Sequence, residues 1–178
     1  MTEQSDRQRL IAAQLRDVPD FPKPGILFKD IAPILESPVA FRACIELFAE
    51  RWRGEKLDRI AGLESRGFPF GAALAYELGV GFSMLRKKGK LPSKRIGVEY
   101  ALEYGTDYIE AHIDTVLPGQ RVLLIDDLLA TGGTANAALR LLRDHLQANV
   151  VGAAFVVELT FLGGAARLDV PMQVLVTV

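Results

Sequence analysis

The sequence predicts an α/β fold, in which a central, twisted and mostly parallel sheet is flanked by helices. Short apolar runs of strand length recur along the chain, at residues 60–63, 80–85, 122–125, 150–159 and 174–178. Helical patterns lie between most of these runs, and strands that alternate with helices imply parallel pairing through right-handed crossovers. The length of 178 residues and the hydrophobic fraction of 49% predict a single domain over residues 1–178 with a substantial core.

Composition and charge exclude several classes of protein. Lys and Arg number 21 and Asp and Glu 22, so the net charge of −1 provides no basic field for nucleic acid or an anionic membrane. The single cysteine excludes an intramolecular disulfide and favours a reducing compartment. No apolar run approaches the roughly 18 residues of a membrane-spanning helix, and residues 2–9 are polar rather than signal-like. We therefore expect a soluble cytoplasmic protein without nucleic-acid or membrane partners.

The N-terminal part of the chain predicts a helix followed by an extended arm. Residues 5–17 have a polar cap and a few apolar positions at helical spacing. Residues 18–30 contain three prolines, which forbid a helix and impose an extended path. The arm is either purely structural or a wall for a flat ligand, in which case Phe28 supplies a stacking face and Lys29 a polar handle.

A clear helix follows over residues 38–52, with Ser37 as its cap and Pro38 at its first position. Its apolar residues recur at helical spacing and predict core packing. Cys44 belongs to this stripe, so we expect a buried, inert thiol rather than a nucleophile.

Two further strands end in charged segments. Residues 60–63 lead into Arg66 and then a helix that stops before Gly79. Residues 80–85 lead into a basic turn from Arg86 to Lys90. Such a turn is either simply solvated or, because it lies at the same strand-end rim as Arg66, able to meet a diphosphate.

Residues 97–113 change the pattern, since β-prone residues surround a Gly-Thr-Asp turn. We expect a two-stranded flap that is exposed and mobile, because no long apolar face is visible that would hold it against the core. His112 lies on the return strand and is expected at the surface.

The most informative stretch begins with the apolar strand at residues 122–125, at whose end Asp126 and Asp127 follow. The next segment is small and hydroxylic and leads into a helix; it consists of Ala130, Thr131, Gly132, Gly133 and Thr134. Open α/β sheets bind ligands at such carboxyl ends of strands. The glycines allow a ligand to approach the backbone, and the free N–H groups at the helix start favour a phosphate. The carboxylates can accept hydrogen bonds from sugar hydroxyls, so the stretch predicts a site for a phosphorylated sugar.

This stretch resembles the phosphoribosyl-diphosphate (PRPP) binding motif of the type I phosphoribosyltransferases. Its sequence DDLLATGGT is similar to the form of the motif in the adenine phosphoribosyltransferases in particular. Four more segments agree with that family in the same order, and they read FPKPGILFKD, ESRGF, RKKGKLP and LEYGTD. The resemblance covers residues 21–162. It implies the type I phosphoribosyltransferase fold, with residues 1–35 as a hood over the base site and residues 97–113 as a mobile β-flap.

The resemblance also implies an activity in purine salvage. The 5-phosphoribosyl group of PRPP would be transferred to adenine, giving AMP and diphosphate. Mg²⁺ would be the cofactor, held mainly by PRPP and water, because the sequence shows no dedicated cluster of metal ligands. The family further implies a homodimer.

Roles for single residues follow from the same resemblance. Adenine would stack on Phe28, with Leu27 and Lys29 beside it, although many relatives carry arginine in place of Lys29. The flap residue Glu103 would close over the base and act as a catalytic group together with Arg66. The family places a non-proline cis peptide before the arginine.

Phosphate groups would have two binding regions. The diphosphate would contact Arg66, Arg86 and Lys90, in the family partly across the dimer interface. The ribose would contact Asp126 and Asp127. The 5′-phosphate would bind Ala130, Thr131, Gly132, Gly133 and Thr134.

Three alternatives remain beside this prediction. Another purine, such as hypoxanthine, guanine or xanthine, would keep the chemistry and change the base. A non-catalytic PRPP-sensing regulator would keep the fold, but the sequence has no basic stripe for DNA. A nucleotide-dependent dehydrogenase would need the G-x-G-x-x-G fingerprint after a first strand, which is missing.

Overall fold

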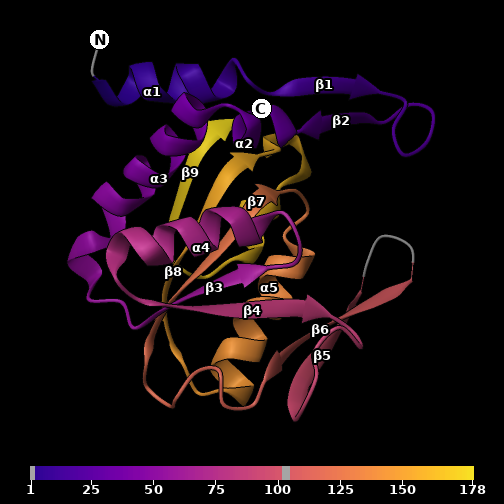
Figure 1. Ribbon diagram of the computed structural model, residues 1–178. Coiled ribbons are helices and arrows are strands. Elements are labelled where there is room, and N and C mark those ends of the chain that lie inside the picture. Colours follow the sequence, from indigo (N-terminus) through magenta and orange to yellow (C-terminus); the bar gives the residue numbers. More distant parts are fainter. Residues whose placement is uncertain (1–2, 102–104) are drawn as a thin grey trace.

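The computed structural model describes residues 3–101 and 105–178, which form a seven-stranded sheet, a small two-stranded sheet and the helices around them (Figure 1). The strand order of the large sheet is β5-β6-β4-β3-β7-β8-β9. Five neighbouring strands are parallel: β4 (Gly81–Lys87), β3 (Arg59–Leu63), β7 (Arg121–Leu129), β8 (Asn149–Glu158) and β9 (Met172–Thr177). The hairpin of β5 (Arg95–Ala101) and β6 (Thr106–His112) adds the antiparallel edge. The predicted mostly parallel sheet is thereby confirmed.

Helices cover both faces of this sheet. On one face lie α3 (Pro38–Trp52) and α4 (Gly67–Leu78), and on the other lies α5 (Gly133–Arg140), which continues as a wider turn over Leu141–His145. Alternate residues of β7 serve the two cores: Leu123 packs with α3 and α4, whereas Leu124 packs with α5. Burial on both faces explains why the central strands are continuous apolar runs rather than alternating ones.

The helices at residues 38–52 and 67–78 have the ends that the sequence predicts. The Ser37 side chain accepts a hydrogen bond from the backbone N–H of Ala40 at 3.3 Å, and Pro38 occupies the first turn of α3. Gly79 ends α4 with a φ of 69°, a left-handed conformation that favours glycine. Cys44 is fully buried in α3, as expected.

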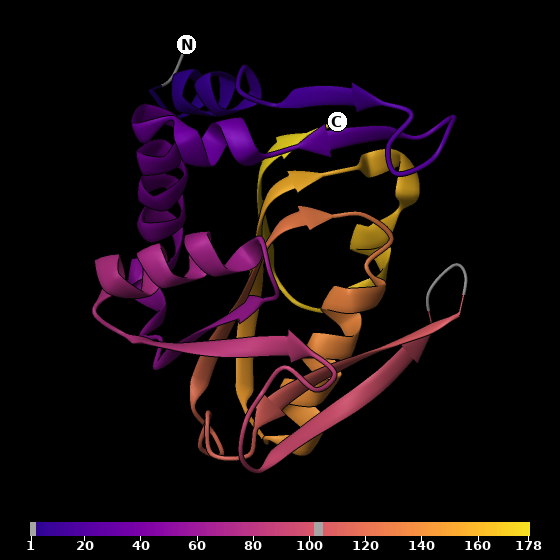
Figure 2. The ribbon, with the colours of Figure 1, turned by 45° about the vertical axis from the view of Figure 1, so that its right-hand side comes forward.

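The N-terminal region differs from the predicted helix over residues 5–17. α1 (Glu3–Ala12) starts and ends earlier, and β1 (Arg16–Pro19) pairs with β2 (Leu27–Asp30) as an antiparallel hairpin. Pairing with the strand that follows the loop of residues 20–26, with an Arg16–Asp30 ion pair across the hairpin, outweighs the local helical pattern. The short helix α2 (Ala32–Glu36) then leads to α3. Figures 1 and 2 show this hairpin and the β5–β6 hairpin projecting toward the same side of the molecule.

Strand β7 also differs from the prediction that it ends at Ile125. It continues through Asp126 and Asp127 to Leu129, because its pairing with β8 extends to Glu158. The acidic pair therefore lies within a strand rather than in a turn. Successive residues of a strand point to opposite faces, so the two carboxylates leave the backbone in different directions.

The β5–β6 hairpin is less exposed than the sequence suggested. Its alternate residues Val98, Tyr100, Ile109 and Ala111 are buried in the core beside α5, and β6 pairs with β4. The hairpin stem is thus part of the main sheet, and the expectation of a flap without an apolar face was wrong for the stem. The mobility of residues 97–113 stays a prediction, and Glu103 lies outside the described residues. No helix in the described part of the chain is long and apolar enough to span a bilayer.

Candidate functional site

Most of the predicted site residues line one cavity of about 460 Å³ at the carboxyl ends of β3, β4 and β7. The cavity brings together the acidic pair, the segment that follows it, and the turn after β3. Its lining residues are Glu64, Ser65, Arg66, Lys87, Asp126, Asp127, Leu128, Leu129, Ala130, Thr131, Gly132, Gly133, Thr134 and Ala135. The predicted ribose- and phosphate-binding residues thus share a single site, and Arg66 joins them.

The loop over residues 130–134 depends on close backbone packing. Gly132 precedes α5 with a φ of 77°, and a Cβ atom placed on it would lie 2.5 Å from the carbonyl oxygen of Gly164. A Cβ on Gly164 would in turn lie 2.1 Å from the carbonyl oxygen of Ala130. The glycines were expected to allow the approach of a ligand, but a side chain on Gly132 would meet a second backbone segment. By contrast, a Cβ on Gly133 would meet its nearest neighbour at 3.6 Å, an ordinary contact.

Arg66 links the N-terminal hairpin to the acidic pair. It is the cap residue of α4 and follows a cis peptide between Glu64 and Ser65, as the resemblance implied. Its Nε lies 2.8 Å from Oδ2 of Asp127, and its guanidinium carbon lies 5.3 Å from the centre of the Phe28 ring. Cationic and aromatic groups attract at this separation. One arginine therefore contacts both the predicted base site and the predicted ribose site.

The acidic pair is unusually costly to ionise. Burial raises the pKa of Asp126 well above its ordinary value, and the neighbouring charge of Asp127 raises it further. Burial also raises the pKa of Asp127, although the cation of Arg66 opposes this. Asp127 is only 3% exposed, and its Oδ2 accepts no well-aligned hydrogen bond in the described structure despite the ion pair. Buried oxygens of this kind are suited to accept hydrogen bonds from ligand hydroxyls.

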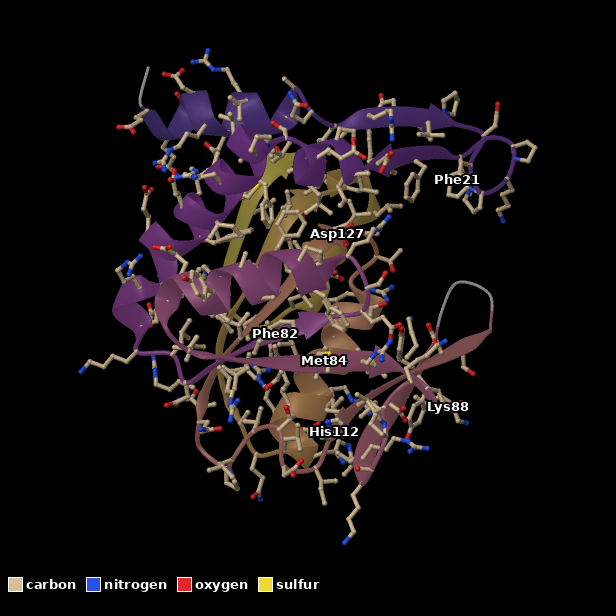
Figure 3. The ribbon with its side chains drawn as sticks, in the orientation of Figure 1. Phe21, Phe82, Met84, Lys88, His112 and Asp127 are labelled. Carbon is tan, nitrogen blue, oxygen red and sulfur yellow. The ribbon has the colours of Figure 1, made fainter. Side chains whose placement is uncertain are left out.

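The three residues predicted to contact the base lie together on β2, outside the lining of the cavity. Phe28 faces Arg66 and packs edge-on against Phe21 at 5.1 Å between ring centres. Leu27 and Lys29 alternate with it along the strand, and Leu27 is half exposed. The ammonium of Lys29 donates to Asp17 at 2.6 Å, so that side chain is already paired within the hairpin. Figure 3 shows Phe21 near the end of the hairpin and Asp127 beneath it toward the sheet.

In the basic segment of residues 86–90, the residue that lines the cavity differs from those predicted. Arg86 donates from Nε and Nη2 to both carboxylate oxygens of Glu64 at 3.1 and 3.2 Å, and from Nη1 to the carbonyl of Lys90 at 3.0 Å. Neither Arg86 nor Lys90 lines the cavity, whereas Lys87 does. Lys87 was not predicted as a site residue, because the strand was expected to end at Leu85. Extending the strand by two residues would have placed Lys87 on the face of the buried Leu85.

The carboxylate of Glu64 is fixed by hydrogen bonds from two residues, Arg86 and Lys87. It accepts from the backbone N–H of Lys87 at 2.9 Å. Burial would raise the pKa of Glu64, but the hydrogen bonds from Arg86 and Lys87 outweigh this and lower it. Among the described residues, no cluster of three or more His, Cys, Asp or Glu side chains could hold a metal ion.

Known proteins resemble this chain over nearly its whole length. A family model described as the phosphoribosyl transferase domain matches residues 30–175. The adenine phosphoribosyltransferase of Rhodopseudomonas palustris (strain BisB5) is 52% identical over 169 residues, which cover 93% of each chain.

Solved structures agree with the sequence relatives. The crystal structure of adenine phosphoribosyltransferase from Rhodothermus marinus matches with a TM-score of 0.93 and 46% identity, covering 98% of this chain and 99% of that one. The enzyme from Saccharomyces cerevisiae, complexed with an imino-altritol bisphosphate and adenine, matches with a TM-score of 0.91 and 41% identity, covering 96% and 99%. The chain therefore belongs to the phosphoribosyl transferase domain family and, within it, to the adenine phosphoribosyltransferases.

Proposed function

We infer that this chain transfers the 5-phosphoribosyl group of PRPP to adenine, producing AMP and diphosphate in purine salvage. The observation that carries this inference is the contact of Arg66 with both Phe28 and Asp127, because it joins a flat aromatic surface to a sugar-phosphate site. The relatives named above are adenine phosphoribosyltransferases, and the yeast enzyme was crystallised with adenine. The single buried cysteine is in keeping with a cytoplasmic location, which we also propose.

The loop of residues 130–134 is proposed to hold the 5′-phosphate. Its backbone precedes α5, where N–H groups have no partner within the helix and the helix dipole favours an anion. Asp126 and Asp127 are proposed to accept hydrogen bonds from the ribose hydroxyls, which would satisfy the buried Oδ2 of Asp127 described above. These contacts fix the ribose in position and thereby contribute orientation to the reaction.

The diphosphate is the leaving group, and positive charge develops on the ribose carbon as it departs. Arg66 and Lys87 lie in the cavity and are proposed to stabilise the charge of the departing group. Arg86 donates hydrogen bonds to the Glu64 carboxylate and to the carbonyl of Lys90, and neither Arg86 nor Lys90 lines the cavity of the same subunit. We propose that they contact diphosphate in the partner subunit of a homodimer, as the family resemblance implies.

Mg²⁺ is the proposed cofactor. Oδ2 of Asp127 forms an ion pair with Arg66 but accepts no well-aligned hydrogen bond among the described residues, and such a carboxylate in a phosphate-binding cavity fits the water shell of a divalent cation, which would be held mainly by PRPP oxygens and water. When bound, it would neutralise charge on the diphosphate.

The base is proposed to lie against Phe28, with backbone atoms of Leu27 and Lys29 reading its edge. The N-terminal region, residues 1–35, would then act as the hood, and residues 97–113 as the flap of a single domain. Glu103 is proposed to close over adenine and assist in moving its proton. That role rests on the resemblance, since Glu103 lies outside the described residues.

Parallel turnover assays test the function. Purified protein is given PRPP and Mg²⁺ with adenine, hypoxanthine, guanine or xanthine, and nucleotide formation is followed by chromatography. AMP formation with adenine, at a kcat/KM at least about a hundredfold above the other bases, is the expected result. A preference for another base would change the assigned substrate. PRPP binding without any turnover would instead support the sensing alternative.

A chelation control tests the cofactor. Exhaustive removal of divalent cations should abolish AMP formation, and Mg²⁺ should restore it. Full activity in the chelated sample would exclude the metal requirement.

A further inference from the structure

Four side chains meet at the edge of the cavity from three parts of the fold: Lys87 at the end of β4, Tyr100 and Asp107 on the β5–β6 hairpin, and Thr134 at the start of α5. Nζ of Lys87 donates to the hydroxyl of Tyr100 at 2.7 Å and forms an ion pair with Asp107. The Tyr100 hydroxyl donates to Oδ2 of Asp107 at 3.1 Å. The hydroxyl of Thr134 donates to Tyr100 at 3.3 Å.

The donors and acceptors of this group can be counted. The ammonium of Lys87 has three N–H donors, of which Asp107 and Tyr100 receive two. Within residues 3–101 and 105–178 no further acceptor takes up the third, which is available to a ligand in the cavity that Lys87 lines. The Tyr100 oxygen donates once and accepts twice, which uses its full capacity. The arrangement thus fixes the position of the ammonium and leaves one donor for the cavity.

Asp107 is itself held in place. It lies directly across the hairpin from Tyr100, and its Oδ1 accepts from the backbone N–H of Tyr108 at 2.7 Å. Tyr100 is 7% exposed and packs in the core beside α5, so the hairpin stem cannot shift freely; Figure 2 shows that stem running beside the helix. Burial opposes the charge of Lys87, but the hydrogen bonds to Asp107 and Tyr100 outweigh it and raise the pKa of Lys87.

We propose that Asp107 is a positioning residue for PRPP binding: it holds the Lys87 ammonium at the cavity edge so that one N–H points to the diphosphate. This rests on the proposed function, in which Lys87 contacts the departing diphosphate. Asp107 does not line the cavity and acts only through Lys87 and Tyr100. An unheld lysine side chain would lose rotamer freedom on binding, so fixing it in advance lowers the free-energy cost of binding PRPP.

The test is a double-mutant cycle. Asp107→Ala, Lys87→Met and the double variant are compared with the wild type for kcat and for the KM of PRPP. Asp107→Ala should raise the KM of PRPP about tenfold and leave kcat within about twofold. In the Lys87→Met background, the same replacement should change KM by less than about twofold, because the ammonium that Asp107 positions has been removed and only its contact with the Tyr100 hydroxyl is left.

Glu99 provides the matched control. It is another carboxylate of the same hairpin, and its side chain accepts a hydrogen bond from Thr106 on the exposed side. Glu99→Ala should leave KM and kcat unchanged within about twofold. If Asp107→Ala does not fold, Asp107→Asn keeps the volume and one oxygen acceptor while removing the charge, and it should raise KM by about threefold.

Two outcomes would overturn the proposal: an unchanged KM when Asp107 is replaced, or an equal rise of KM with and without Lys87. The same cycle is measured by calorimetry of PRPP with Mg²⁺ and no base. Loss of turnover in the wild type would contradict the proposed enzyme, whereas the calorimetric cycle decides the role of Asp107 independently of turnover.

Discussion

Replacing Gly132 by alanine should test the packing of the phosphate loop most directly. The residue has a φ of 77°, and its added Cβ would lie 2.5 Å from the carbonyl oxygen of Gly164. That neighbour is backbone, which cannot rotate away as a side chain can. Either the loop of residues 130–134 or the turn η4 (Gly164–Arg167) must therefore move.

The magnitude follows from two costs. A left-handed conformation costs a non-glycine residue about 1 kcal/mol. Overpacking that forces a backbone shift costs about 1–3 kcal/mol. We therefore expect Gly132→Ala to lower the free energy of unfolding by about 2–4 kcal/mol, with loss of PRPP affinity because the moved loop is the proposed phosphate site.

Gly163 separates the two costs. Its φ is 64°, and a Cβ placed on it would meet no atom within 4 Å. Gly163→Ala should therefore cost only the conformational part, about 1 kcal/mol. Gly133→Ala, with neither a positive φ nor a close contact, should cost less still in stability.

Urea unfolding of the wild type and the three variants, followed by circular dichroism, gives these free energies, and PRPP titration gives the affinities. A Gly132→Ala variant that is no less stable than Gly163→Ala would contradict the close packing of Gly132 against Gly164. A Gly132→Ala variant that is strongly destabilised yet binds PRPP as the wild type does would show that the loop is unimportant for phosphate.

Three further predictions concern single side chains. Asp126→Asn should raise the free energy of unfolding of the ligand-free protein near neutral pH, because the raised pKa of Asp126 means that folding disfavours its charged form. This gain should shrink as the pH falls toward the unfolded-state pKa of about 3.9. Urea unfolding at several pH values measures it. The same variant should lower kcat/KM about tenfold or more through lost ribose contacts. Cys44, whose pKa burial raises to about 12, should resist a thiol reagent in the folded protein at about pH 8 and react once urea unfolds it. Glu103→Gln should lower kcat about a hundredfold while PRPP affinity stays nearly constant, and an unchanged kcat would remove Glu103 from the mechanism.

The parts of the fold that could be predicted from the sequence are those whose structure is determined by neighbouring residues in the chain. Ser37 and Pro38 mark the start of α3, and Gly79 marks the end of α4, so both helices were predicted with nearly correct ends. The central strands were equally clear, because burial on both faces requires an unbroken apolar run.

Errors arose where a distant partner decides the local structure. Arg16 and Asp17 fit a helical pattern, yet they begin β1 because Leu27–Asp30 is available for pairing. Asp126 and Asp127 resemble a turn, yet β8 extends beside them and keeps them in the strand. Local preference is a weak determinant beside such pairing, and a single sequence does not reveal the partner.

Arg66 shows the same limit within the site. Its place after β3 and before α4 is local, and the sequence predicted it. Its contact with Asp127 requires β7 beside β3, and its contact with Phe28 exists only once the N-terminal hairpin has docked, so three segments that are far apart in the chain meet at this side chain. The hairpin buries little apolar surface of its own at its tip, where Phe21 and Leu27 are each 50% exposed. Its position over the cavity therefore depends in part on the Arg66 cation, which also pairs with Asp127, so a ligand that engages Arg66 acts on the base site and the ribose site together.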